Sequence, residues 1–302
     1  MDLAAHDVTA RDGTTLRVWA VSPPDAGEAV LFLHGGITAS RALFAPPVPG
    51  DDSYSWLHAA ADRGRAAFAL SVRGYGESDP LPAYDEPPGA NDPPIRAVDA
   101  ARDVADAVAF VRERHDTVHL VGYSWGTMTG GCYLADGGDV ASFTAGAPVY
   151  RSPVEFEDAL AGLGLEPGFG AWAVEERETV LARQDPDEMA LFDGVWDVQA
   201  GSNQGVEGED AYRFQTGTLL DVRDACADDP VYDAAAIEVP TLVIRGSADP
   251  TSQREDALSL YDELGADEAE YAELSGSHFV PHGPRRRALY GAVDAFQGRA
   301  AA

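Results

Sequence analysis

Hydrophobic and polar positions follow several different patterns along the chain, and each pattern predicts an element. Residues 7–21, DVTARDGTTLRVWAV, alternate on either side of Asp12 and Gly13, which predicts a β-hairpin. Four short apolar runs without alternation come next, and they predict strands that are buried on both faces of a sheet. Those runs lie in EAVLFLHGG, AAFALSVRGYGESD, VHLVGYS and ASFTAGAP.

Helical spacing separates the predicted strands. Residues 95–115 repeat apolar side chains every three or four positions, which predicts a helix with one buried face. The side chains expected on that face are Ala101, Val104, Ala105, Val108 and Val111. Residues 238–296 return to an order of strand, helix, strand and helix. Strands that alternate with helices of this length predict an α/β fold, with a parallel sheet covered on both faces.

The segment 151–235 interrupts this order. We expect residues 1–150 and 236–302 to form the core domain, and residues 151–235 to be an insertion that lies over the sheet. The insertion contains helical patches, no clear apolar strand, and a glycine-rich stretch, 201–210, that predicts a flexible hinge loop. Its large aromatic side chains predict an apolar roof over a site. They are Phe156, Phe169, Trp172, Phe192, Trp196 and Phe214.

Charge changes the picture next. The chain has 51 acidic residues against 21 basic ones, all of them arginine, and a formal net charge of −30. Such a charge opposes nucleic-acid binding, and its self-repulsion destabilises a compact chain unless salt screens it. Because the carboxylates are spread over the whole sequence, we expect adaptation to a salt-rich cytoplasm. The alternative is a GC-rich genome that favours arginine codons.

The sequence predicts neither a membrane segment nor a secretory signal. No window reaches the ~18 apolar residues needed to span a bilayer, and residues 1–13 lack the basic and apolar regions of a signal peptide. Cys132 and Cys226 have no metal-ligand spacing, so we expect two free thiols in a reducing compartment. We therefore expect a cytoplasmic protein without a membrane partner, and homo-oligomerisation is left open.

Ser124 is the strongest candidate for chemistry. It stands in GYSWG, residues 122–126, where a predicted buried strand ends and a helix can begin. A serine on such a sharp turn needs flanking glycines, because a Cβ at Gly122 or Gly126 would collide with the neighbouring strand and helix. Ligands of parallel sheets bind at the carboxyl ends of the strands. The pattern therefore predicts that Ser124 is a nucleophile.

A serine nucleophile needs a base, an acid behind the base, and donors for the oxyanion. His278 and Asp249 each follow a predicted strand, so we expect both at the same edge of the sheet as Ser124. His282 is the alternative base. The backbone N–H of Trp125, directly after the serine, is one expected oxyanion donor.

The second oxyanion donor should come from the loop after VLFL, residues 30–33. Glycines in that loop allow the backbone to approach a substrate closely. We expect Gly36 to supply the donor, with Ile37 as the alternative, and His34 to be a structural hydrogen-bonding residue.

Five short motifs, in this order, resemble the α/β-hydrolase superfamily. They are LHGG at 33–36, RGYGESD at 73–79, GYSWG at 122–126, GSAD at 246–249 and GSH at 276–278. The resemblance implies the α/β-hydrolase fold, with an eight-stranded, mostly parallel sheet flanked by helices and a mainly helical cap, here residues 151–235. It also implies that Ser124, Asp249 and His278 form a catalytic triad.

By this resemblance we expect a serine hydrolase that cleaves small to medium carboxylic esters through an acyl-enzyme, with no metal or organic cofactor. Ser124 stands where haloalkane dehalogenases and epoxide hydrolases of this fold have an aspartate, and HGGITA departs from the HGGPG of prolyl aminopeptidases. The alternatives are the same triad acting on amide, thioester, lactone or C–C bonds, and a non-catalytic member that binds a ligand.

Overall fold

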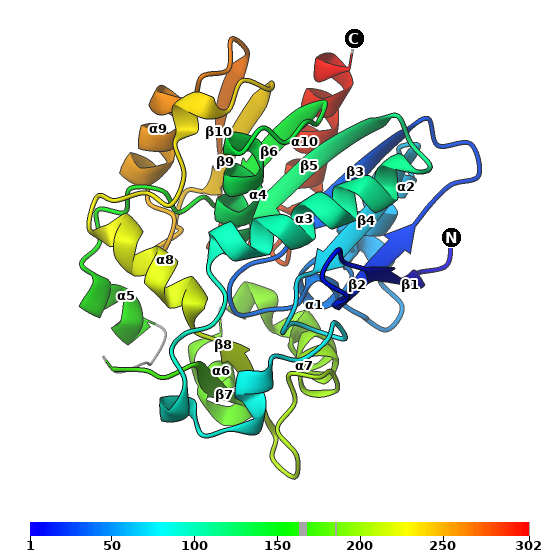
Figure 1. Cartoon of the computed structure of the whole chain (residues 1–302). Coiled ribbons are helices and arrows are strands. Elements are labelled where there is room, and N and C mark those ends of the chain that lie inside the picture. The colour runs from blue at the N-terminus through cyan, green and yellow to red at the C-terminus, as the bar shows by residue number, and fades with distance from the viewer. Residues whose placement is uncertain (163–167, 185, 302) are drawn as a thin grey trace.

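Eight strands form the central sheet in the order β1-β2-β4-β3-β5-β6-β9-β10 (Figure 1). The structure is a computed structural model that describes residues 1–162, 168–184 and 186–301. The strands are β1 Ala4–Thr9, β2 Thr15–Val21, β3 Glu28–Leu33, β4 Arg65–Ser71, β5 Thr117–Tyr123, β6 Ser142–Gly146, β9 Thr241–Gly246 and β10 Ala269–Leu274. Strand β2 pairs antiparallel with β1 and β4, and the other pairs are parallel. The predicted eight-stranded, mostly parallel sheet and the N-terminal hairpin are confirmed.

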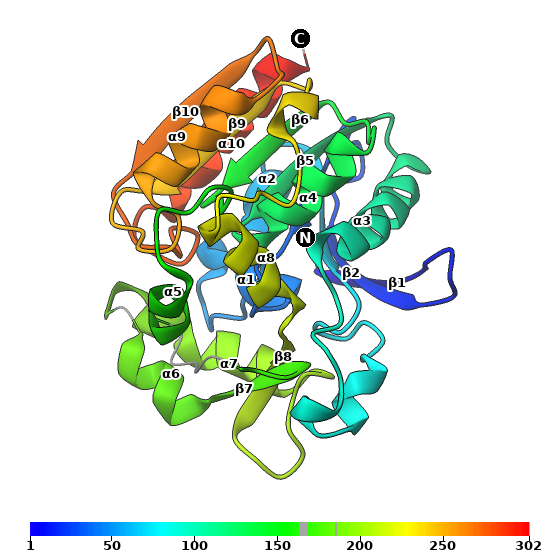
Figure 2. The ribbon, with the colours of Figure 1, turned by 60° about the vertical axis from the view of Figure 1, so that its left-hand side comes forward.

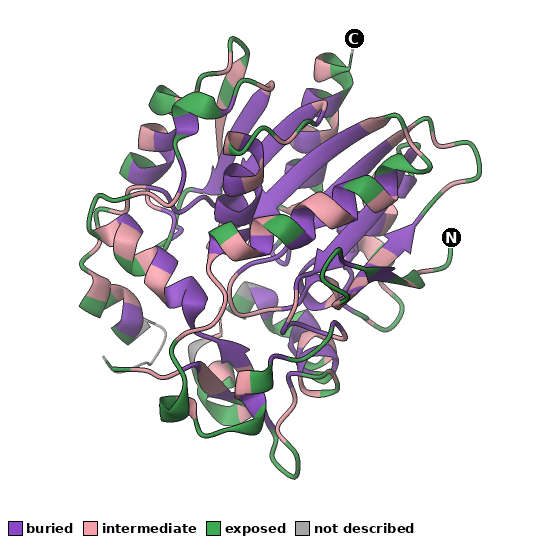
Figure 3. Ribbon diagram, in the orientation of Figure 1, coloured by how far each residue is buried: buried purple, intermediate pink, exposed green. Residues whose placement is uncertain are grey.

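Alternate residues of the strands pack into two separate cores, one on each face of the sheet. On β3, Leu31 and Leu33 belong to the core under α3, α4 and α9, whereas Val30 and Phe32 belong to the core under α2 and α10. These helices are α2 Trp56–Ala61, α3 Ala97–Arg112, α4 Trp125–Ala135, α9 Arg254–Glu263 and α10 Arg286–Ala300. Figure 3 shows the inner strands of the sheet buried and the outer helix faces exposed. Burial on both faces explains why the strand sequences are apolar without alternation.

The buried face of α3 agrees in part with the one predicted from spacing, because Val104, Val108 and Val111 are buried as expected. Ala101 and Ala105 are only half-buried. The buried residues that were not expected are Ala97, Ala100, Asp103 and Ala107. Asp103 can be buried because Arg73 Nη2 contacts its Oδ1 at 2.6 Å. An ion pair with a distant loop therefore allows a polar side chain to lie on the buried face, which apolar spacing alone does not predict.

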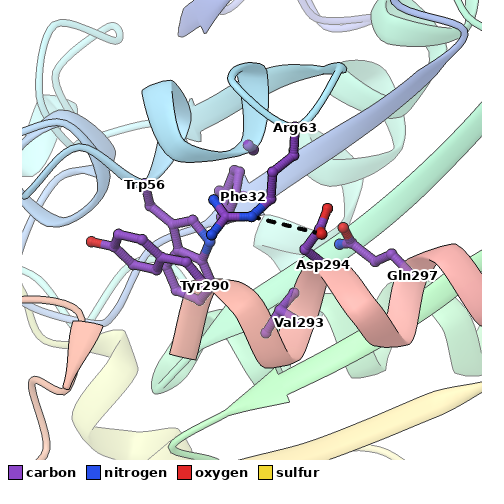
Figure 4. Close-up of a pocket in the computed structure, with 8 residues that line it drawn as sticks. Phe32, Trp56, Arg63, Tyr290, Val293, Asp294 and Gln297 are labelled. Atoms are coloured by element: carbon purple, nitrogen blue, oxygen red, sulfur yellow. Dashed lines mark ion pairs between the residues drawn. The ribbon is translucent and has the colours of Figure 1, made fainter. Parts of the chain in front are cut away.

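Aromatic stacking joins α2 to α10 on the second face of the sheet (Figure 4). The rings of Trp56 and Tyr290 lie 4.8 Å apart with 23° between their planes, and Phe32 lies 5.1 Å from the ring of Trp56. Arg63, just after α2, pairs with Asp294 of α10 at 3.7 Å. The crevice between these side chains has a volume of about 10 Å³, room for one water molecule, so it is a packing gap and not a ligand site.

The segment between β6 and β9 gathers at one end of the sheet (Figure 2). Its main elements are α5 Phe156–Gly162, β7 Trp172–Glu176, α6 Arg177–Arg183, α7 Phe192–Ala200, β8 Ala211–Gln215 and α8 Gly217–Cys226. Strands β7 and β8 pair antiparallel, although the sequence of this segment has no clear apolar strand. A two-stranded ribbon is not buried on both faces and lacks a continuous apolar run, which is why the hydrophobic pattern did not predict it. Residues 163–167 and 185 of the predicted insertion lie outside the described residues.

The glycine-rich stretch 201–210 was expected to be a free hinge loop, but its first half is tied to the core. Asn203 Nδ2 donates to the backbone oxygen of Ser78 at 2.9 Å. The buried Gln204 accepts the Gly76 N–H at 2.9 Å through Oε1. These bonds fasten the stretch to the loop after β4.

Candidate active site

Ser124 occupies a sharp turn between β5 and α4. Its backbone has φ 55° and ψ −123°, a conformation that L-residues rarely adopt and that is strained. A Cβ added to Gly122 would lie 2.3 Å from the oxygen of Gly126, and one added to Gly126 would lie 2.2 Å from the oxygen of Leu33. Both contacts are with backbone atoms, so only glycine fits on either side of the serine, as the steric argument predicts.

His278 and Asp249 form a hydrogen-bonded pair. His278 Nδ1 lies 2.8 Å from Asp249 Oδ2. Asp249 Oδ1 accepts the backbone N–H groups of Thr251 at 2.8 Å and Ser252 at 2.9 Å. Because Nδ1 donates to a carboxylate, the neutral ring has its lone pair on Nε2, which is the form that a general base requires.

The two members of this pair shift each other's pKa. Burial alone would lower the pKa of His278, but the charge and hydrogen bond of Asp249, and then the charge of Glu188, outweigh it and raise the pKa. Burial alone would raise the pKa of Asp249, but the positive charge and hydrogen bond of His278, with the two backbone donors, lower it. Each charge therefore stabilises the other, so the site supports the imidazolium that forms when the ring accepts a proton.

His282, the alternative base, forms a hydrogen bond with the backbone instead. Its Nε2 lies 3.0 Å from the backbone oxygen of Leu43, and its ring stacks on Phe279 with the centroids 5.7 Å apart. Burial lowers the pKa of His282 to about 4. Because Nε2 must carry a proton to donate to a carbonyl, its lone pair is not on that atom, so His282 is placed as a structural residue.

One cavity of about 650 Å³ brings the predicted residues together. Ser124, His278, Gly36 and Trp125 all line it, and Asp249 is bonded to His278 from behind. These residues follow β3, β5, β9 and β10, at the carboxyl ends of the parallel strands. The volume and place are those of a small-molecule site in an α/β protein.

Known proteins share this architecture. A sequence profile of a family described as alpha/beta hydrolase fold matches residues 28–282. This chain belongs to the α/β-hydrolase family. Among curated proteins, none is similar enough in sequence to match it.

Solved structures share the fold of this α/β hydrolase at low sequence identity. E-2-(acetamidomethylene)succinate hydrolase is 21% identical with a TM-score of 0.67, over 98% of this chain and 99% of that chain. An esterase from Exiguobacterium antarcticum is 17% identical with a TM-score of 0.65, over 98% and 100%. An enol-lactonase from Burkholderia xenovorans is 18% identical with a TM-score of 0.65, over 96% and 99%. These similarities show the fold only, so the reaction has to be inferred from the residues of the site.

Residues of the segment 151–235 complete the wall of the cavity in this α/β hydrolase. Its apolar members include Val180, Leu191, Phe192, Val195, Trp196 and Tyr212. Phe192 and Trp196 were expected in an apolar roof and do line the cavity. Their rings stack with centroids 5.9 Å apart and 18° between the planes.

The other four aromatic side chains expected in the roof are not among the described residues of the cavity wall. Phe214 is fully buried in the main core. Phe156 and Phe169 pack on each other with ring centroids 6.3 Å apart. Trp172 points its indole N–H at the backbone oxygen of Ala83, 3.1 Å away. Aromatic content predicted a roof, but docking of the segment on the core decided which rings face the cavity.

Polar side chains of the same wall carry no motif, and sequence analysis missed them. Glu188 is 3% exposed, and its Oε1 accepts the hydroxyl of Ser277 at 2.6 Å while its Oε2 lies 2.5 Å from Gln184 Nε2. Thr218 Oγ1 lies 2.1 Å from where a Cβ on Gly36 would be, so a side chain at position 36 would strike it. Each is an isolated polar residue, so its place became visible only in the folded chain.

The helix after the serine is held by the same segment. Helix α4 begins at Trp125, so the N–H of this residue has no acceptor within the helix. The indole Nε1 of Trp125 donates to Asp221 Oδ2 at 2.7 Å, and the Ala97 N–H donates to the same oxygen at 2.8 Å. Asp221, on α8, is also bonded to Arg96. One buried carboxylate thus connects α3, α4 and α8 beside the serine.

Three further observations bear on cofactors and compartment. Within residues 1–162, 168–184 and 186–301, no three His, Cys, Asp or Glu side chains are grouped in a way that could hold a metal ion. Over the same ranges, no helix has both the length and the apolar character needed to cross a bilayer. Cys132 is buried, Cys226 is half-buried, and both thiols are free.

Proposed function

We propose that this α/β hydrolase cleaves carboxylic esters of small to medium size through an acyl-enzyme intermediate. The observation that carries the proposal is the 2.8 Å contact of His278 with Asp249, at the wall of a cavity that Ser124 also lines. The largely apolar wall suits a hydrocarbon acyl or alcohol group. In this proposal, residues 151–235 act as a cap over the cavity.

In the proposed reaction, His278 Nε2 takes the proton of Ser124 as the serine oxygen attacks the carbonyl carbon. The carbonyl π electrons move to oxygen, and the N–H groups of Gly36 and Trp125 stabilise the oxyanion. The intermediate then collapses, the bond to the alcohol oxygen breaks, and the imidazolium gives its proton to the leaving alcohol. Water cleaves the acyl-serine by the same route, while Asp249 orients and stabilises the imidazolium.

Replacement of the nucleophile tests the proposal. We expect Ser124→Ala to lower kcat for p-nitrophenyl acetate and butyrate by at least about 10⁴-fold in molar KCl, because no other group forms the acyl-enzyme. The melting temperature should stay close to that of the parent protein. Activity equal to that of the parent would remove Ser124 from the mechanism.

The bond type is tested separately. Active-site labelling by a fluorophosphonate should be lost in Ser124→Ala and present in the parent. A panel of ester, amide, thioester and lactone substrates, with a C–C hydrolase substrate, should show the highest kcat/KM for the esters. Faster turnover of another class would change the assigned bond, and a parent protein that is not labelled would indicate a ligand-binding role.

A further inference from the structure

The loop after β3 carries the proposed oxyanion donor Gly36, and hydrogen bonds of buried side chains fix its conformation. His34 Nε2 accepts the Val72 N–H at 3.2 Å, so the neutral ring carries its proton on Nδ1, 2.6 Å from the oxygen of Gly35. Burial lowers the pKa of His34 to about 4, which keeps the ring neutral. In a trans peptide the N–H points away from the preceding C=O, so this bond also sets the direction of the Gly36 N–H.

The next peptide group is held by two fully buried side chains. The hydroxyl of Tyr75, in the loop after β4, donates to the oxygen of Gly36 at 2.6 Å. The same hydroxyl accepts a hydrogen bond from Gln215 Nε2 at 3.1 Å. By the same peptide geometry, fixing the Gly36 oxygen fixes the direction of the Ile37 N–H. Gln215 ends β8, so this chain of bonds begins in the segment 151–235.

Gln199, on α7 of that segment, bonds the loop through both the oxygen and the nitrogen of its side-chain amide. Its Oε1 accepts the Ala39 N–H at 2.8 Å, and its Nε2 donates to the oxygen of Ile37 at 3.3 Å. The residue is 1% exposed, so water does not compete for these groups. Three consecutive carbonyls of the loop, those of Gly35, Gly36 and Ile37, are therefore each held by a side chain.

We infer that Gln199 is a positioning residue: by holding the Ile37 oxygen and the Ala39 N–H, it keeps the loop next to Gly36 in the conformation that presents the donor N–H groups to the oxyanion. The inference rests on the proposed function. Hydrogen-bond donors that are fixed before the reaction stabilise the developing negative charge without reorganising. A loop that loses the bonds of Gln199 should therefore stabilise the transition state less, while the protein still binds substrate. The segment 151–235 then takes part in the reaction and does not merely cover the cavity.

Paired leucine substitutions test this inference. Gln199→Leu removes both bonds at similar length. Gln204→Leu is the matched control, because Gln204 is also a buried glutamine of the segment that bonds two backbone groups, the Gly76 N–H at 2.9 Å and the Arg213 oxygen at 3.0 Å. We expect Gln199→Leu to lower kcat for p-nitrophenyl butyrate about 10- to 100-fold with KM changed less than about 3-fold. Affinity for a trifluoromethyl ketone, which binds as an oxyanion, should fall by the same factor as kcat.

Tyr75→Phe provides a second variant that preserves side-chain volume and removes only the hydroxyl, and we expect it to lower kcat about 10-fold. Loss of kcat in Gln204→Leu equal to that in Gln199→Leu would mean general packing and would overturn the inference. A change in KM alone, or an unchanged affinity for the ketone, would also overturn it. Fluorophosphonate labelling of the parent separates the two hypotheses: labelled Ser124 with an unaffected Gln199→Leu ends this inference alone, and unlabelled Ser124 ends both.

Discussion

At the scale of single residues, the chemistry of the proposed site depends on the charges around one imidazole. Asp249 is bonded to Nδ1 of His278, and Glu188 raises the pKa of the same ring by its charge. Tyr123 packs against the ring with centroids 6.1 Å apart, and its hydroxyl donates to the His278 backbone oxygen at 2.8 Å. Two carboxylates therefore act on the base. Among the described residues of the cavity wall there is no arginine to oppose them.

Removal of one of these charges should move the pH dependence. Glu188→Gln leaves a side chain of the same shape and lowers the pKa of His278, because one of the negative charges that favours the imidazolium is gone. The base works only when neutral, so activity is lost as pH falls through its pKa, and a lower pKa shifts the acidic limb of kcat/KM to lower pH. A pH profile with p-nitrophenyl butyrate measures the shift.

Ser277→Ala is the control for that measurement. It removes the hydroxyl that binds Glu188 at 2.6 Å but keeps both carboxylates, so its acidic limb should stay at the parental pH. A Glu188→Gln profile that coincides with the parental one would show that the charge does not reach the base.

At the scale of elements, the serine turn depends on how closely β5, α4 and the end of β3 approach. Gly126 lies in the first turn of α4, and the added Cβ that would meet Leu33 at 2.2 Å has only backbone to displace. Because α4 and β3 lie so close together, the serine is exposed at the edge of the sheet. The glycines are thus part of the packing as much as of the turn.

Alanine at position 126 should therefore be costly. We expect Gly126→Ala to lower the free energy of unfolding by about 2–3 kcal/mol, because the helix must move away from β3. Gly291→Ala is the matched control, since nothing lies within 4 Å of a Cβ at that position of α10. It should stabilise by about 0.5–1 kcal/mol, the usual gain from glycine to alanine in a helix. Urea unfolding in molar KCl measures both, and equal stability of the two variants would contradict the steric account.

The elements also show how far sequence patterns reach. The inner strands of the central sheet were predictable because a strand buried on both faces needs a continuous apolar run, as residues 66–70 of β4 provide. Spacing along α3 predicted the burial of Val104 and Val108 but not that of Asp103, because its partner Arg73 lies in a distant loop. The β7–β8 ribbon was missed because its pairing joins residues about forty positions apart, as Trp172 with Gln215.

At the scale of the whole molecule, charge is the dominant property. The formal net charge is −30, and 21 arginines are too few to give each of the 51 carboxylates an ion-pair partner of its own. Some arginines serve several acids at once, as Arg151 does with Asp228 at 2.7 Å and Glu263 at 2.9 Å. We propose that the protein works in a salt-rich cytoplasm, where ions screen the remaining repulsion.

Salt should therefore stabilise the fold. We expect the melting temperature to rise steeply between 0.1 M and about 1 M KCl, because the screening length falls from about 10 Å to about 3 Å over that range. Differential scanning calorimetry at fixed pH measures the rise, with Ser124→Ala as a control that should follow the same curve. Full stability retained below about 0.5 M KCl would refute the screening argument and favour codon bias as the origin of the arginines.

The sequence by itself determined the order of strands and helices in the core domain and the glycine-serine turn. Both depend on residues close together in the chain, where apolar spacing and backbone sterics act directly. It also predicted Ser124, Asp249 and His278 as one site, because carboxyl ends of parallel strands meet at one edge. Only the tertiary structure decided which aromatic rings face the cavity, that Glu188 lies near the base, and that Gln199 holds a loop 160 residues away. Those contacts depend on how one long segment docks on the sheet, and no local pattern encodes a docking geometry.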